Sequence, residues 1–259
     1  MTQYSANLGF LWQELTLCDA IRKAADAGFD AVECHWPYTV ATDDVADALR
    51  AAAIPMLGLN TRLGDKDAGD FGLAAVPGRE LEARTYIDEA IEYARAINCG
   101  AVHAMAGRTG ASAASESTYR RNLAYACERA QAHSITILIE PINHRDVPDY
   151  HLSNVEVGCA TIDALGFDNL KIMFDCYHTQ IMQGDLTTRM RDKLAYIGHV
   201  QIAAVPDRGE PDAGELDYKK LMQTLDAMGY SGYVGAEYKP RASTDAGLAW
   251  LRDFNRAET

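Results

Sequence analysis

The sequence predicts an α/β fold in which eight parallel strands, each followed by a helix, close into a single (β/α)8 barrel. Short apolar runs rich in β-branched residues alternate with amphipathic segments along the chain, which is the pattern of repeated βαβ units. The 259 residues suit this fold, because such barrels have about 250 residues. No Gly-x-Gly-x-x-Gly motif follows the first strand, which disfavours an open dinucleotide-binding sheet. We therefore expect one domain over residues 1–259.

The apolar runs and amphipathic segments indicate where each strand and helix lies along the chain. We expect strands at residues 4–7, 31–33, 56–59, 101–105, 136–139, 170–174, 197–202 and 233–237. Helical patterns between them include residues 19–27, 80–97, 119–133, 155–165 and 218–228. The expected helix ends are stops at Gly28, Gly100, Gly166 and Gly229, and a capping box of Ser153 with Glu156. The longest irregular segments, 60–79, 143–153 and 203–216, each follow a strand, on the face where such barrels carry their chemistry.

Composition limits the classes of partner. The formal net charge is −13, which disfavours nucleic acid and anionic membranes, because both attract basic surfaces. No run of about 18 apolar residues could span a bilayer, and the first ten residues lack the pattern of a signal peptide. We expect a cytoplasmic protein that acts on a small molecule, with no nucleic acid and no membrane as partner. Homo-oligomers are common among soluble enzymes, so the oligomeric state stays open.

Oxygen-bearing side chains lie at the ends of four consecutive expected strands. Glu140 follows the fifth apolar run and Asp175 the sixth, Gln201 lies within the seventh strand, and Glu237 ends the eighth. The C-terminal ends of barrel strands converge at one mouth, so the four could share one small region. A single such carboxylate could equally pair with an Arg or cap a helix, and Gln201 alone could bond to backbone. Four on neighbouring strands favour a common site.

This set predicts a metal centre. Three carboxylates and an amide oxygen form an all-oxygen site, which suits Mg²⁺ or Mn²⁺ rather than zinc or copper. A divalent cation that chelates adjacent hydroxyl and carbonyl oxygens stabilises an enediolate, and so allows a carbonyl to move between neighbouring carbons. Glu140 and Glu237, three strands apart, could flank the substrate as the pair that removes and returns a proton.

An acidic substrate would need a cation of its own. Arg208 is the candidate, because a guanidinium matches a carboxylate bidentately. Pairing with the nearby Asp207 or Glu210 is an equal alternative on sequence alone. Lys239 and Arg62 are weaker candidates of the same kind.

Several motifs together resemble the hydroxypyruvate isomerase family, within the xylose-isomerase-like barrel superfamily. The resemblance covers nearly the whole chain and rests on Ser5-Ala6-Asn7-Leu8, Pro77-Gly78-Arg79-Glu80, Ile139-Glu140-Pro141-Ile142-Asn143-His144, Asp175-Cys176-Tyr177-His178, Gly198-His199-Val200-Gln201-Ile202-Ala203, Arg208-Gly209-Glu210-Pro211 with Gly214-Glu215, and Glu237-Tyr238-Lys239-Pro240. The combination is specific, whereas each tetrapeptide alone is not.

The resemblance implies a xylose-isomerase-like TIM barrel in which Glu140, Asp175, Gln201 and Glu237 hold the metal. It further implies that Glu140 and Glu237 transfer the proton, and that His178 and Arg208 contact the substrate. From the residues alone, His178 would more readily be structural, and His103 and His199 would be satisfied core residues or neighbours of the ligands. Better-known members have an acidic residue and Asn where this chain reads Ala204-Val205, so the substrate stays open.

The expected reaction is the interconversion of hydroxypyruvate and 2-hydroxy-3-oxopropanoate (tartronate semialdehyde) through an enediolate. An isomerase or epimerase of a 2-oxo-tetronate or a ketose is the main alternative. Two remote alternatives are a metal-dependent endonuclease acting on abasic DNA, which would favour a basic groove, and a barrel without catalytic activity. The second of these gives no reason for a hard-metal set.

Overall fold

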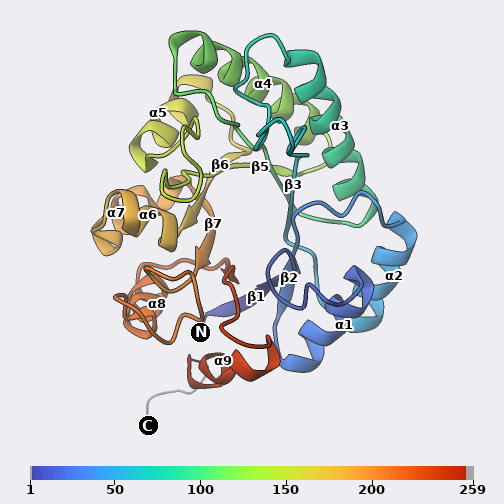
Figure 1. Ribbon diagram of the computed structural model, residues 1–259, viewed down its shortest axis with the longest axis vertical. Helices are drawn as coiled ribbons and strands as arrows, with labels where there is room; N and C mark the ends of the chain where they lie inside the picture. Colours follow the sequence, from blue (N-terminus) through green and yellow to red (C-terminus); the bar gives the residue numbers. More distant parts are fainter. Residues whose placement is uncertain (1, 255–259) are drawn as a thin grey trace.

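The structure is a computed structural model that describes residues 2–254, and these residues form the predicted barrel (Figure 1). Its strands are β1 (Gln3–Asn7), β2 (Ala31–Glu33), β3 (Gly58–Asn60), β4 (Ala101–His103), β5 (Thr136–Ile139), β6 (Leu170–Asp175), β7 (Ile197–Ile202) and β8 (Tyr233–Ala236). The helices are α1 (Leu17–Ala27), α2 (Thr42–Ala52), α3 (Glu80–Ala96), α4 (Ala113–Gln131), α5 (Val155–Leu165), α6 (Cys176–Met182), α7 (Leu186–Lys193), α8 (Tyr218–Ala227) and α9 (Ala249–Phe254). Two 3-10 turns are η1 (Leu194–Tyr196) and η2 (Asp245–Gly247). Every expected strand is present, with shifts of one or two residues at the ends.

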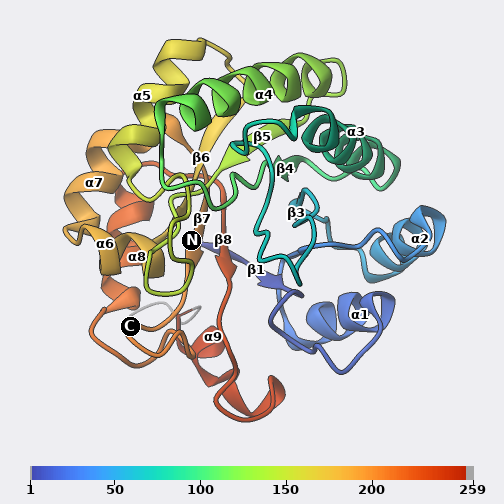
Figure 2. The ribbon, with the colours of Figure 1, turned by 45° about the horizontal axis from the view of Figure 1, so that its top comes forward.

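Backbone pairing closes the ring of strands. All pairs are parallel, in the order β2-β1-β8-β7-β6-β5-β4-β3. The two end strands are joined through an isolated parallel bridge between Val32 and Met56, and the amide of Leu57 donates to the carbonyl of Val32 over 2.8 Å. The helices lie on the outside of this ring in the views of Figures 1 and 2. All eight strands therefore end on the same side of the barrel.

Side chains alternate between the two faces of the strands. Ile137, Ile172, Val200 and Val234 are fully buried and belong to the apolar core shared with the helices. Residues of the other parity point into the barrel, where several are polar or small, and they line the cavity described below. The barrel interior therefore contains polar side chains.

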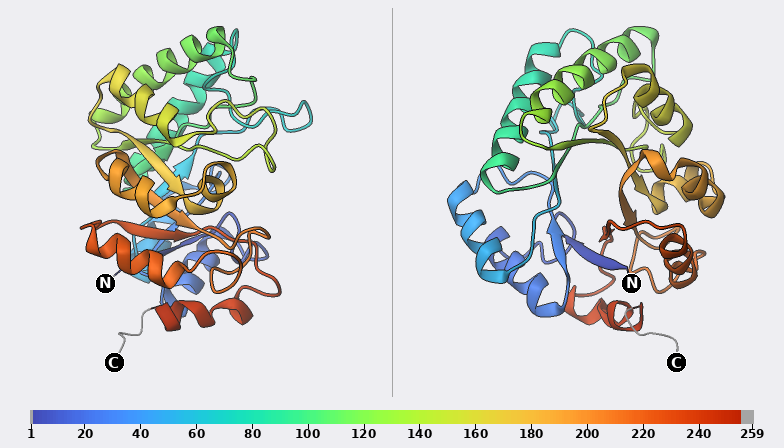
Figure 3. Two further views of the ribbon diagram at one scale, coloured as in Figure 1. Left: turned by 90° about the vertical axis from the view of Figure 1, so that its left-hand side faces the viewer. Right: turned by 180° about the vertical axis from the view of Figure 1, so that it is seen from behind.

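Three long connections project from the side on which the strands end. Residues 60–79, 143–153 and 203–216 contain no α-helix, and Figure 3 (left) shows these segments extending together from the same side of the molecule. They leave the opposite face to shorter turns. The prediction that the irregular segments border the strand ends is confirmed.

Helix ends were predicted correctly in part. Gly28 and Gly166 cap α1 and α5 in the left-handed conformation, with φ of 94° and 68°, where a side chain would cause strain. The stop expected at Gly100 is wrong, because Asn98 takes the positive φ of 56° just after α3. The capping box of Ser153 is also wrong, since the side chain of Asn154 accepts from the amides of residues 156 and 157.

Some helices were not named from the sequence. In α2, Val45, Ala48 and Leu49 are the buried residues and show the i, i+3, i+4 spacing of a helix face. No loop precedes α6, because Asp175 both ends β6 and caps α6. Among residues 2–254, no helix combines the length and apolar character that a membrane crossing requires.

Replacing the cap of α5 should destabilise the fold. Asn154→Ala removes the acceptor for two amides, and we expect the free energy of unfolding to fall by about 1 kcal/mol. Ser153→Ala is the matched control and should cost clearly less. Urea denaturation of both variants measures this, and equal losses would show that Asn154 is not the effective cap.

Candidate functional site

The four oxygen-bearing residues predicted at the strand ends converge. Glu140 directly follows β5, Asp175 ends β6, Gln201 lies in β7 and Glu237 directly follows β8; each is at most 6% exposed. The strand register pairs Asp175 with Gln201, and Gln201 with Gly235. Ligand atoms of Glu140, Asp175, His178 and Glu237 all lie within 4.8 Å of one another. This buried group could hold a metal ion.

Three oxygens of the predicted set have no hydrogen-bond partner among the described residues. They are Glu140 Oε1, Asp175 Oδ2 and Gln201 Oε1. Buried polar atoms are normally hydrogen-bonded, so three partnerless acceptors on neighbouring strands require an explanation. The amide oxygen of Gln201 can only accept a hydrogen bond or bind a cation, and the same holds for the oxygens of Glu140 and Asp175 when these carboxylates are ionised. The donor set therefore fits a hard divalent cation.

The pKa values of the three carboxylates also favour a bound cation. Burial raises the pKa of Glu140 well above its usual range, and the charges of Glu237 and Asp175 raise it further. Burial likewise raises the pKa of Asp175 to about 7, although Arg208 opposes the shift. Burial would also raise the pKa of Glu237, but Arg208 and His35 outweigh it and lower that pKa to about 2. The cluster carries too much buried negative charge to ionise fully without a cation.

Hydrogen bonds fix which nitrogen of His178 carries a proton. The backbone amide of Asn143 donates to Nδ1 over 3.3 Å, and the Asn143 side-chain amide lies 2.5 Å from the same atom. Since Nδ1 accepts, a neutral imidazole has its proton on Nε2, which lies 3.6 Å from Glu140 Oε1 and from Asp175 Oδ2. Burial and Arg208 lower the pKa of His178 well below its ordinary value, so the ring is neutral. His178 thus presents a donor to the site, not a lone pair.

Arg208 also reaches the site. Its Nη2 atom lies 2.5 Å from Glu237 Oε2 and 3.8 Å from Asp175 Oδ2. The guanidinium is held between the rings of Phe10 and Tyr177, with centroids 4.7 and 5.0 Å away. The geometry therefore brings the predicted Arg208 to the cluster.

The other cations considered from the sequence lie elsewhere. Asp207 and Glu210, the rival partners of Arg208, pair with Arg241. Arg62 pairs with Glu89 through two hydrogen bonds, and Lys239 is exposed.

Sequence reasoning missed several polar neighbours. Asn7 Nδ2 donates to Glu237 Oε1 over 2.9 Å, and His35 Nε2 lies 3.1 Å from the same oxygen. Glu33 is 4% exposed and ends β2, so the rule that found the other carboxylates at strand ends would have found it. His103, expected to be a satisfied core residue or a neighbour of the ligands, has no hydrogen-bond partner for either ring nitrogen in the described structure, but its Nδ1 lies 3.6 Å from Glu140 Oε2, so the second alternative applies. Burial lowers the pKa of His103 to about 3.

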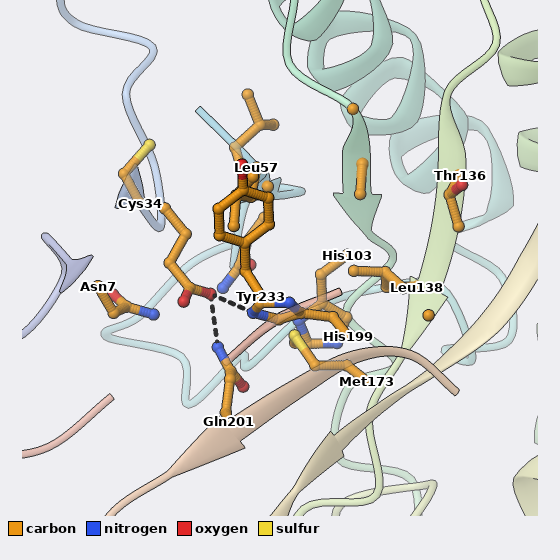
Figure 4. A pocket seen from close by; sticks show the side chains of 17 residues that line it. Asn7, Cys34, Leu57, His103, Thr136, Leu138, Met173, His199, Gln201 and Tyr233 are labelled. Carbon is orange, nitrogen blue, oxygen red and sulfur yellow. Dashed lines mark hydrogen bonds and ion pairs between the residues drawn. The ribbon is translucent and has the colours of Figure 1, made fainter. Parts of the chain in front are cut away.

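A cavity of about 200 Å³ lies inside the barrel (Figure 4). Thr136 and Tyr233, the first residues of β5 and β8, line one end, while Asn7, His103 and Gln201 line the part nearest the strand ends. The cavity thus runs through the barrel interior toward the start of the strands, and Glu140, Asp175 and Glu237 are not among the residues that line it.

The chain matches known proteins over almost its full length. The model of the family described as xylose isomerase-like TIM barrel matches residues 21–254. A 2-oxo-tetronate isomerase from Cupriavidus necator is 44% identical, with 98% of this chain and 99% of the relative covered. A hydroxypyruvate isomerase from Escherichia coli is 40% identical, with coverage of 98% and 100%.

Solved structures agree with this assignment. The structure of an AP endonuclease, family 2, from Brucella melitensis superimposes with a TM-score of 0.95 at 39% identity, with 99% of this chain and 100% of that chain covered. A D-psicose 3-epimerase from Clostridium cellulolyticum H10 reaches a TM-score of 0.79 at 16% identity, covering 98% and 91%, which shows a common fold alone. By its family-model match and its full-length relatives, this chain belongs to the xylose isomerase-like TIM barrel family.

Proposed function

We propose that this chain is an isomerase that depends on one divalent metal ion and interconverts hydroxypyruvate and 2-hydroxy-3-oxopropanoate. The observation that carries the proposal is the set of partnerless buried oxygens on Glu140, Asp175 and Gln201 at the ends of neighbouring strands. The names of the full-length relatives support the reaction class, because they are isomerases of small acids with adjacent hydroxyl and carbonyl groups.

Glu140, Asp175, Gln201 and Glu237 would hold the ion. Three carboxylates and one amide oxygen suit Mg²⁺ or Mn²⁺, which prefer oxygen ligands. The bound ion would supply positive charge to the hydroxyl and carbonyl oxygens of the substrate, which lowers the energy of an enediolate. The raised pKa values of Glu140 and Asp175 support this assignment, since a nearby dication favours their ionised forms.

Glu140 and Glu237 are the proton-transferring pair in this proposal. One carboxylate removes a proton from carbon 3 of hydroxypyruvate, and the electron pair of that C–H bond forms the enediolate. The other glutamate, protonated beforehand, delivers its proton to carbon 2 and becomes a carboxylate, and exchange with water then removes the proton taken up by the first glutamate and reprotonates the second. The hydroxyl proton passes from oxygen 3 to oxygen 2, so carbon 3 becomes an aldehyde and carbon 2 an alcohol. His178 Nε2–H donates a hydrogen bond to a substrate oxygen as negative charge develops there.

Arg208 binds the carboxylate of the substrate. Three acidic side chains and one dication leave a net charge of −1, so an anionic substrate is repelled unless a further cation is present. The guanidinium of Arg208 lies beside Glu237 and Asp175, and its central carbon lies over the rings of Phe10 and Tyr177. A planar fork of donors matches a carboxylate better than an ammonium does.

A 2-oxo-tetronate is the second candidate substrate, because the 44% identical relative is named for it and the same enediolate chemistry applies. Ala204 and Val205, where the chain departs from better-known family members, are buried in the loop after β7. An endonuclease is disfavoured, since a net charge of −13 opposes binding of a polyanion.

Activity should require the metal and Glu237. Turnover of hydroxypyruvate should be lost after chelation and return with Mg²⁺ or Mn²⁺. Glu237→Gln should lower kcat/KM by at least about 10³, as removal of a general base typically does. Glu215→Gln, an exposed change in the loop after β7, is the control. Full turnover after thorough chelation would contradict the proposal.

The carboxylate role of Arg208 can be separated from a general structural one. Arg208→Lys keeps the charge and loses the bidentate fork, so KM should rise more for hydroxypyruvate than for a neutral ketose. Arg241→Lys, which changes the neighbouring Arg paired with Asp207, should leave the ratio of the two KM values unchanged. An unaltered ratio in Arg208→Lys would remove this residue from the clamp.

Metal-induced stabilisation should grow with pH. The folded metal-free protein keeps protons on Asp175 up to a pKa of about 7, so its stability falls as the pH rises toward that value. Metal binding needs the ionised carboxylates, and thus Mn²⁺ should raise Tm more at pH 8 than at pH 6. Thermal unfolding with and without Mn²⁺ measures the difference. Asp175→Asn should weaken the dependence, and equal gains at both pH values in the unmodified protein would refute it.

A further inference from the structure

Glu33 places a carboxylate inside the barrel, next to the proposed ligand Gln201. It is the last residue of β2 and is 4% exposed. Gln201 Nε2 donates to Glu33 Oε2 over 2.8 Å, and His199 Nε2 lies 3.1 Å from the same oxygen. In Figure 4, dashed lines from the labelled side chains of Gln201 and His199 mark these two contacts. Ser5 Oγ donates to the other oxygen, Oε1, over 3.0 Å.

Strand β8, separated from β2 only by β1, leaves room for this carboxylate. Gly235 lies in the middle of β8, beside Gln201 in the strand register. A Cβ atom at this position would overlap Glu33 Oε1 and would lie 2.9 Å from His199 Nε2 and 3.0 Å from Gln201 Cγ. Glycine in a strand interior loses packing and often marks a close approach of another group. Here the approaching group is the Glu33 side chain.

The contact decides which end of the Gln201 amide faces the proposed metal. An amide presents a donor at one end and an acceptor at the other, and the two ends have nearly the same shape. A carboxylate accepts only, so Gln201 turns its NH2 group toward Glu33. Its Oε1 atom then points away from Glu33 and has no partner within the described residues. An amide free to rotate would offer NH2, which cannot bind a cation, about as readily.

We propose that Glu33 is a positioning residue: it fixes the Gln201 amide so that Oε1 is presented to the divalent cation. This inference rests on the proposed metal-dependent function. The competing explanation is that Glu33 serves only the packing of the barrel interior, through its contacts with His199 and Ser5.

Exchanging the carboxylate at position 33 and the amide at position 201 distinguishes these two explanations. The measurement is the affinity of the metal-free protein for Mn²⁺, followed through the electron paramagnetic resonance of the free ion. Glu33→Gln should weaken binding by about 10- to 100-fold, as loss of a group that orients a ligand typically does. The new amide can donate to Gln201 Oε1 and turn it away from the cation.

The same substitution should have the opposite effect when residue 201 is a glutamate. In Gln201→Glu, two carboxylates face each other across the barrel. Adding Glu33→Gln restores an amide–carboxylate hydrogen bond with the carboxylate now at position 201, so Mn²⁺ binding should strengthen relative to Gln201→Glu alone. A packing role predicts the same direction in both backgrounds. This second comparison still decides the matter if Glu33→Gln alone does not fold.

Ser5→Ala is the matched control, because it removes a hydrogen bond to Glu33 Oε1 and leaves the contact with Gln201, and Mn²⁺ affinity should stay within about threefold. Circular dichroism and Tm confirm that each variant folds. If the unmodified protein binds Mn²⁺ and Glu33→Gln changes affinity in the same direction in both backgrounds, the positioning role is overturned alone. If the unmodified protein binds no Mn²⁺, the proposed metal dependence is overturned and this inference with it.

Discussion

Repulsion among buried carboxylates is the constraint around which the open end of this barrel is built. Closure of eight parallel strands brings together side chains that lie one or two strand–helix units apart in the sequence, so Glu140, Asp175 and Glu237 share a space of a few ångströms. Burial and mutual charge raise the pKa of Glu140 well above its usual range. Such a cluster costs stability unless positive charge offsets it. The neighbouring hydrogen-bond donors and Arg208 partly offset that cost.

The surrounding residues stabilise the three carboxylates of the cluster unequally. Asn7, His35 and Arg208 all donate to Glu237. By contrast, Glu140 Oε1 and Asp175 Oδ2 have no hydrogen-bond partner within the described chain, and each lies 3.6 Å from His178 Nε2. One carboxylate is thus neutralised by the protein itself, and the remaining negative charge is concentrated on the side of β5 and β6. This asymmetry explains why the pKa of Glu237 is lowered while the pKa values of the other two are raised.

The sequence was sufficient to place the strands and the polar side chains at their ends, because both follow from local pattern. Apolar β-branched runs mark each strand, and a polar residue at the end of such a run must lie at the mouth once the strands are parallel. Choices between adjacent capping residues were not accessible, since Ser153 and Asn154 can both cap and only the backbone decides. Contacts across the barrel were equally hidden: Glu33 and Gln201 are far apart in sequence, and their pairing depends on how far each side chain reaches inward.

Several positions inside the barrel lack the packing or the hydrogen bonds that a stable interior normally has. Barrels of this class usually fill the interior with layers of bulky apolar side chains. Here Gly58 lines a cavity, Gly235 leaves its place to the carboxylate of Glu33, and both ring nitrogens of His103 are without partners among the described residues. Each of these features loses packing or hydrogen bonds, and a purely structural interior would gain stability by replacing them. Local rules are broken in this way where function requires it. Two of these features adjoin predicted ligands, since His103 lies beside Glu140 and Gly235 beside Gln201, so the interior is not arranged for stability alone.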